Sequence, residues 1–155
     1  MANHLDVPRS DANAILSSQK IAPQAPWRPS ATGQREVWEL VAGVTTEGGL
    51  YKKALTIELI CQQTLKPYRT NYKFSLFLYE HGCKRRVYQL DTTSVPVCDE
   101  GKHDWPHQHI GQDRVVFGSS YPAGFVESLE HFCKEANVKF EEQIESPFDF
   151  KLKPT

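Results

Sequence analysis

A clear alternation of apolar and polar residues in the middle of the chain restricts the fold more than any other feature. Between residues 51 and 61 the apolar residues occupy every second position, as Leu55, Ile57, Leu59 and Cys61. The side chains of a β-strand point alternately to opposite faces of its sheet. The pattern therefore predicts a strand with one face in the core and the other face in water.

Four other segments carry strand signals. Apolar residues also alternate along residues 35–44 and 72–79. His81-Gly82 predicts the tight turn of a hairpin that joins residues 72–79 to a returning strand at 84–91. A short apolar segment follows later in the chain. The five predicted strands cover residues 35–44, 51–61, 72–79, 84–91 and 114–117.

One helix is long enough to cover a face of this sheet. Its apolar positions follow helical spacing and are Phe125, Val126, Leu129, Phe132, Cys133 and Ala136. A shorter helix is expected from Ser10, as its N-cap, to about Gln19. We therefore predict an α+β fold in which an antiparallel sheet of about five strands packs against a C-terminal helix.

A chain of 155 residues is interpreted as a single domain. Its core spans residues 34–137, and 1–33 hold the short N-terminal helix and a proline-rich linker. Three prolines in residues 21–33 predict a linker without regular structure, because proline lacks a backbone donor. Residues 138–155 form an acidic and aromatic tail that begins with either a last strand or an irregular extension.

The composition gives no indication of a membrane or of secretion. No apolar run approaches the roughly 20 residues that a membrane-spanning helix needs. The first ten residues lack the basic and then apolar order of a secretion signal. The four cysteines form no Cys-x-x-Cys pair, which favours reduced thiols. We therefore expect a cytoplasmic protein that does not associate with membranes.

The formal charge of −1 conceals two segments of opposite charge. Residues 66–86 contain six basic residues and one acid, whereas residues 127–149 contain seven acids and two basic residues. The basic segment can contact the phosphates of a nucleic acid, and the acidic segment can dock on a protein partner. Alternatively, the two segments are solvated faces of opposite sign.

Three of the six histidines, His103, His107 and His109, lie within seven residues of a predicted long loop at 92–110. If the end of the loop is extended, His107 and His109 point to the same side. Two such imidazoles can bind zinc or another divalent metal, with His103, Asp104 or Cys98 as further ligands. They can also act without a cofactor, as acid and base on a phosphodiester. A third interpretation is a set of polar loop histidines with no site.

A phosphate site is expected beside this loop. Asp91 ends the fourth strand, and the arginines near it could hold a phosphate through paired N–H donors. Alternatively, these arginines pair with acids on the polar face of the sheet. The candidate catalytic residues are His103, His107, His109 and Asp91, and the candidate phosphate-binding residues are Arg85, Arg86, Arg114, Lys66 and Arg69.

The order of strand, glycine turn, strand, aspartate, polar loop, His-x-His, strand and helix resembles the TumE-like toxins of bacterial toxin–antitoxin modules. It also resembles a family of small proteins of bacterial mobile elements with a late Pro-His-x-His motif, here Pro106-His107-Gln108-His109. The resemblance spans about residues 72–137. It implies a ribonuclease-like toxin that acts on RNA, here expected to be independent of metal, with His107 and His109 as the motif histidines and an antitoxin as partner. The alternative is a non-catalytic inhibitor or adaptor encoded by a mobile element.

Overall fold

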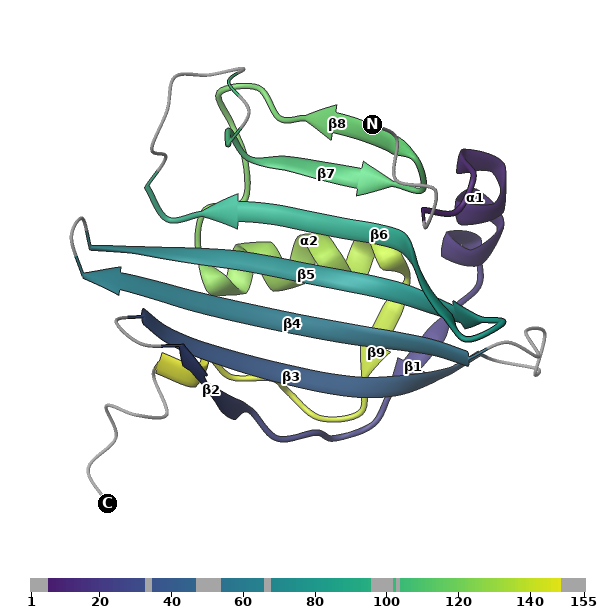
Figure 1. Cartoon of the computed structure of the whole chain (residues 1–155), viewed down its shortest axis with the longest axis horizontal. Helices are drawn as coiled ribbons and strands as arrows, with labels where there is room; N and C mark the ends of the chain where they lie inside the picture. Colours follow the sequence, from purple (N-terminus) through teal and green to yellow (C-terminus); the bar gives the residue numbers. More distant parts are fainter. Residues whose placement is uncertain are drawn as a thin grey trace.

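The structure, a computed structural model, describes residues 6–32, 35–46, 54–65, 68–95, 102 and 104–148. Within these residues the chain is α+β, with two helices and nine strands of one mixed sheet (Figure 1). The elements are α1 (Arg9–Ser17), β1 (Lys20–Ala22), β2 (Arg28–Thr32), β3 (Arg35–Thr46), β4 (Ala54–Leu65), β5 (Tyr68–Glu80), β6 (Cys83–Thr93), β7 (His107–Ile110), β8 (Asp113–Val116), α2 (Phe125–Ala136) and β9 (Val138–Phe140).

The sheet has the strand order β8-β7-β6-β5-β4-β3-β1-β9. The strand β2 also pairs with β3, over residues 35–39, whereas β1 pairs with residues 45–46 of β3. Neighbouring strands are antiparallel except β1 and β9, which are parallel. The long strands β3, β4 and β5 are the segments with the alternating pattern, and β6 is the returning strand of the predicted hairpin. The predicted turn at His81-Gly82 is confirmed. Both turn residues have positive φ angles, which suits a tight hairpin.

The prediction of about five strands was wrong, because β1, β2, β7 and β9 were not counted. All four have three to five residues, which is too short for an alternating pattern to stand out. The strand β7 lies in the segment that was predicted as loop 92–110, and β6 also extends into that segment as far as Thr93. The strands β1, β2 and β7 each pair with a long strand, and β9 pairs with β1. Hydrogen bonding to these neighbours makes the short segments regular.

The linker prediction was also wrong, since residues 20–22 and 28–32 are strands. Pro29 lies within β2, opposite Trp38 of β3. Among the described residues β2 pairs with β3 alone. The other side of β2 is therefore a sheet edge, where no backbone N–H has to donate to a neighbouring strand. Proline is tolerated at such an edge. The N-terminal helix begins at Arg9, with Pro8 rather than Ser10 at its N-cap position.

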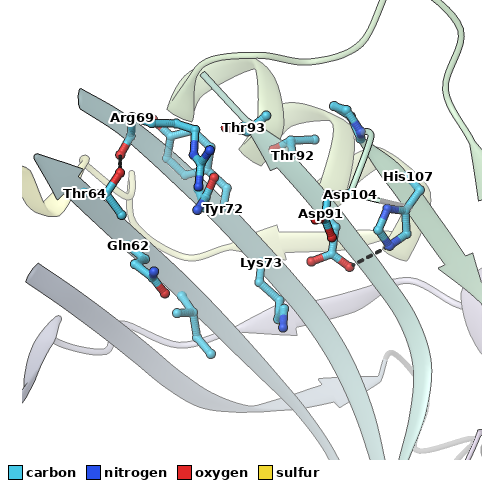
Figure 2. A pocket seen from close by; sticks show the side chains of 13 residues that line it. Gln62, Thr64, Arg69, Tyr72, Lys73, Asp91, Thr92, Thr93, Asp104 and His107 are labelled. Carbon is cyan, nitrogen blue, oxygen red and sulfur yellow. Dashed lines mark hydrogen bonds and ion pairs between the residues drawn. The ribbon is translucent and has the colours of Figure 1, made fainter. Parts of the chain in front are cut away.

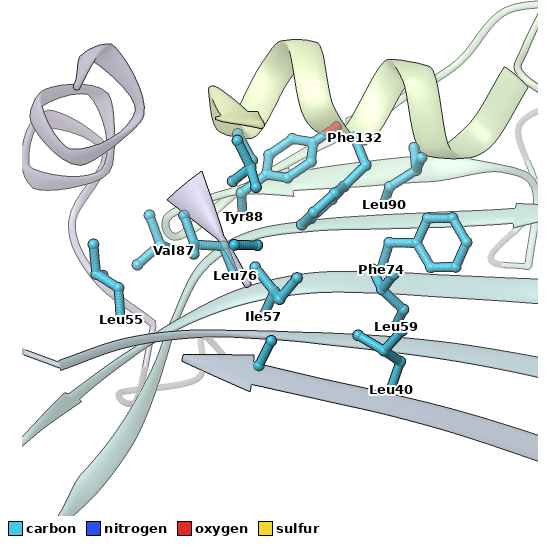
Figure 3. Packing of buried hydrophobic residues seen from close by; sticks show 14 of the residues in the cluster. Leu40, Leu55, Ile57, Leu59, Phe74, Leu76, Val87, Tyr88, Leu90 and Phe132 are labelled. Atoms are coloured by element: carbon cyan, nitrogen blue, oxygen red, sulfur yellow. The ribbon is translucent and has the colours of Figure 1, made fainter. Parts of the chain in front are cut away.

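The predicted helix at Phe125–Ala136 is confirmed, and it covers one face of the sheet behind β5 and β6 in Figure 1. It is not C-terminal, because β9 and residues up to Phe148 follow it. Phe132 is fully buried against the rings of Phe74 and Tyr88 (Figure 3). The core therefore lies between α2 and one face of the sheet, and the opposite face is left to polar side chains.

The segment before α1 is attached to the irregular part of β6. The pairing of β5 with β6 shifts register at Leu76/Phe77, where Val87 is the extra residue. There the N–H of Val7 donates to the carbonyl of Arg86 at 3.1 Å, and the N–H of Gly111 donates to the carbonyl of Val87 at 2.7 Å. The extra residue forms a β-bulge, and the backbone groups at this bulge bind the N-terminal segment and the β7–β8 turn.

Candidate functional site

The polar face of the sheet brings the predicted catalytic residues of β6 and β7 together. His107 lies directly opposite Asp91 in the pairing of β6 with β7, and Lys73 lies opposite Asp91 on β5. Directly opposed residues share a face of the sheet, and so do residues two apart along a strand. Lys73, Asp91, His107 and His109 are therefore neighbours on the face that α2 does not cover.

Asp91, His107 and His109 form a cluster, called the Asp-His-His cluster below. The Nε2 atom of His107 is 3.3 Å from Oδ2 of Asp91, and the Nε2 atom of His109 is 3.9 Å from the same oxygen. The two imidazole rings are 5.0 Å apart and nearly perpendicular. All three side chains are less than one quarter exposed. One carboxylate oxygen is thus the point on which two ring nitrogens converge.

Gln108 determines which way the two histidines face. Its side chain points to the core side of β7, where the buried hydroxyl of Tyr88 donates to Oε1 of Gln108 at 2.6 Å. His131 of α2 also approaches Oε1 of Gln108, with its Nε2 atom at 3.2 Å. A strand that anchors Gln108 toward the core must present His107 and His109 to the opposite face. The orientation of the site is therefore set by a buried hydrogen bond.

Trp105 determines which nitrogen of His107 carries a proton. The carbonyl of Trp105 lies 2.8 Å from Nδ1 of His107, and a carbonyl can only accept, so Nδ1 donates. The Trp105 side chain is itself buried, and its Nε1 donates to the carbonyl of Phe117 at 3.0 Å. Any lone pair of the ring therefore lies on Nε2, the nitrogen that faces Asp91.

The environment keeps the ring of His109 neutral. Burial is the main cause that lowers the pKa of His109 to about 4. Repulsion from Arg86, and from His107 in its protonated form, adds to the decrease. The carboxylates of Asp91 and Asp6 act in the opposite direction but do not reverse it. At pH 7 the ring of His109 therefore holds an unprotonated nitrogen.

A cavity of about 500 Å³ opens beside the cluster on the polar face. Asp91 and His107 lie at one end, Arg69 lies at the other, and Lys73 lies between them (Figure 2). The Nε and Nη1 atoms of Arg69 are buried and have no hydrogen-bond partner among the described residues. Buried N–H donors of a cation are costly to leave unpaired. The cavity is therefore suited to an anionic group that accepts from Arg69.

The other predicted phosphate-binding residues are placed differently. Arg86 binds Asp6 at 2.7 Å and donates to Gln89, and Arg85 binds Glu80 at 3.1 Å. Arg114 is exposed on β8, opposite His109 in the strand pairing. Arg85 and Arg86 thus pair with acids, which was the alternative to phosphate binding in the sequence analysis. Lys66, His103 and Cys98 lie outside the described residues.

Two residues that line the cavity had no catalytic or phosphate-binding role in the sequence-based site. Lys73 has no motif around it, and only its alternation with Phe74 places it on the polar face. Asp104 was proposed only as a metal ligand. The partner of Arg86 could not have been foreseen, because Asp6 is 80 residues away in the chain.

Comparison of the chain with models of known protein families, with curated proteins and with solved structures found no match. No helix among the described residues combines the length and the apolar character that crossing a bilayer requires.

Proposed function

We propose that this protein is a ribonuclease-like toxin that cleaves RNA in the cavity beside Asp91, His107 and His109. The observation that carries the proposal is the Asp-His-His cluster at one end of a cavity whose other end holds the unpaired donors of Arg69. The first feature can activate a hydroxyl group, and the second can hold a phosphate. The resemblance of residues 72–137 to TumE-like toxins points to the same reaction class.

The cavity fits a nucleotide unit better than a duplex. Its volume of about 500 Å³ lies within the range of sites for small ligands. Arg69 and Lys73 line it and would attract phosphates along a single strand. Guanidinium donors in fixed positions also stabilise the charge that develops on phosphate oxygens during cleavage. Binding and cleavage would then occur on the same face of the sheet.

The cluster could activate the attacking hydroxyl in two ways. A neutral imidazole can accept its proton, or a metal ion held by the cluster can lower its pKa. Both ways use residues of this cluster, so the function is tested first at Asp91, His107 and His109.

The test is cleavage of an end-labelled single-stranded RNA, with DNA of the same sequence as a second substrate. The variants Asp91→Asn, His107→Gln and His109→Gln are each expected to lower the RNA cleavage rate by roughly 100-fold or more. The control variant is His81→Asn, which changes an exposed histidine in the β5–β6 turn at a positive φ that asparagine tolerates. It should cleave at the wild-type rate. Equal rates in all four variants would refute the assignment of the site.

Expression in bacteria tests the role as a toxin. Induction of the wild-type chain should arrest growth, and His107→Gln should relieve the arrest at the same protein level. A chain that neither cleaves RNA nor arrests growth would contradict the proposed function and favour the non-catalytic inhibitor or adaptor.

A further inference from the structure

We propose that Asp91, His107 and His109 bind a single divalent transition-metal ion. Each residue offers one ligand atom, and the three ligand atoms lie within 4.8 Å of one another. They come from two adjacent strands, so the backbone hydrogen bonds between β6 and β7 hold them in place. The site differs from the metal site expected from the sequence, because Asp91 takes the place considered there for His103, Asp104 or Cys98.

Two of the three separations between ligand atoms are close to those of an occupied site, and the third is at most 4.8 Å. Metal–ligand bonds of about 2.0–2.1 Å in a tetrahedral site place neighbouring ligand atoms about 3.3 Å apart. The separation of His107 Nε2 from Asp91 Oδ2 is 3.3 Å, and that of His109 Nε2 from the same oxygen is 3.9 Å. Small side-chain rotations of His109 are enough to bring its nitrogen into range.

The hydrogen bonding of His107 favours a cation at this point. Its Nδ1 donates to the carbonyl of Trp105 at 2.8 Å, so any lone pair of the ring lies on Nε2, which is 3.3 Å from a carboxylate oxygen of Asp91. Two acceptors at this distance repel each other unless a positive charge lies between them. Metal-bound histidines commonly donate their other ring nitrogen to a carbonyl in this way, which orients the ring.

A proton between His107 and Asp91 would also supply positive charge, but it would bridge only these two groups. The Nε2 atom of His109 approaches the same carboxylate oxygen. A single metal ion can accept the lone pairs of both nitrogens and of the oxygen. The geometry of all three groups is therefore better explained by a metal ion than by a proton.

The ligand types restrict the metal. Imidazole nitrogens suit zinc, iron, nickel and copper, whereas magnesium and calcium prefer oxygen ligands. Three protein ligands leave at least one coordination position open for water or substrate, as in catalytic zinc sites. A metal ion here would adjoin the cavity that Arg69 and Lys73 line, where it could meet an anionic group.

The inference concerns binding and does not rest on RNA cleavage, because it is tested with the metal alone. The full-length chain is purified, freed of metal with a chelator and titrated with Zn²⁺ by calorimetry. One equivalent should bind to the wild type. Because loss of an outer-shell partner alone weakens binding 10- to 100-fold, loss of a ligand in Asp91→Asn, His107→Gln or His109→Gln should weaken it by at least about 100-fold.

The matched control is His81→Asn, which removes an exposed imidazole from the β5–β6 turn but leaves the three ligands in place. It should bind one equivalent with nearly the wild-type affinity. Thermal unfolding of each variant, with and without Zn²⁺, shows whether it is folded. Zn²⁺ should raise the Tm of the wild type and of His81→Asn but not of His109→Gln.

The proposal would be overturned by either of two results. One is a wild-type chain that binds no Zn²⁺ at 100-fold excess. The other is one-equivalent binding that persists in all three ligand variants, which would place the metal elsewhere. RNA cleavage by a chain that binds no metal would refute the metal site alone, and metal binding without cleavage would refute the proposed function alone.

Discussion

Replacing Gln108 with leucine should destabilise the protein through the buried hydroxyl of Tyr88. Tyr88 is fully buried, and its hydroxyl donates to Gln108 at 2.6 Å. Leucine is close to glutamine in size but cannot accept this bond. A buried polar group without a partner costs about 1–3 kcal/mol. The nearby ring of His131 is only half-buried, so its nitrogen can be solvated instead.

We expect a loss of about 2 kcal/mol in the free energy of unfolding for Gln108→Leu. In a chain of this size, 1 kcal/mol corresponds to about 2–4 °C, so the Tm should fall by about 4–8 °C. Tyr88→Phe removes the hydroxyl and should cost only about 1 kcal/mol. The double variant should therefore be no less stable than Gln108→Leu alone, with a coupling of about 1–2 kcal/mol between the two sites.

The measurement is urea unfolding of the wild type, both single variants and the double variant, followed by far-ultraviolet circular dichroism. Strictly additive losses would show that the two side chains do not interact, and the reasoning would be refuted. The same variants report on the site. Since Gln108 sets the orientation of β7, Gln108→Leu should weaken Zn²⁺ binding, whereas Tyr88→Phe should affect it less because Gln108 keeps His131 as a partner.

Further predictions concern charge and backbone geometry. Burial lowers the pKa of Lys20 from 10.5 to about 8, so the unfolded state binds more protons than the folded state between these pH values. The free energy of unfolding should therefore rise with pH across this window in the wild type but not in Lys20→Met. Urea unfolding at pH 7.5 and 10 measures the difference. In metal-free protein the ring protons of His109 should titrate near pH 4 by NMR, and a midpoint near 6.5 would contradict its described surroundings. Because this folded-state pKa lies below the unfolded value of 6.5, stability should decrease as the pH falls from 6.5 to 4. Gly111→Ala should lower the Tm more than Gly82→Ala, although both glycines have positive φ. A Cβ at Gly111 would lie 2.6 Å from the carbonyl oxygen of Val7, whereas a Cβ at Gly82 would meet nothing within 4 Å. Equal losses in the two glycine variants would show that backbone strain alone is responsible.

Periodicity in the sequence was sufficient to predict the main elements of the fold. The two-residue repeat predicted β3, β4 and β5, and the helical repeat predicted α2 over residues 125–136. The same two-residue rule placed His107 and His109 on one side of a strand. These inferences succeed because a strand or a helix spaces its side chains in a regular way that depends only on neighbours in the chain.

What periodicity could not supply was the pairing of distant segments. The register between β6 and β7 puts Asp91 opposite His107, and the register between β5 and β6 adds Lys73. Arg86, expected at a phosphate, instead binds Asp6 of the N-terminal segment. The residues at 28–32 form a strand on the edge of β3, and the residues at 20–22 form one between β3 and β9.

The amino-acid sequence thus determined which residues lie in the core, which face water, and which short segment concentrates the histidines. The tertiary structure decided which of the polar residues meet. The physical reason is that strand pairing depends on hydrogen bonds and core contacts between residues far apart in the chain, among them the bond from Tyr88 to Gln108 that turns His107 and His109 toward Asp91.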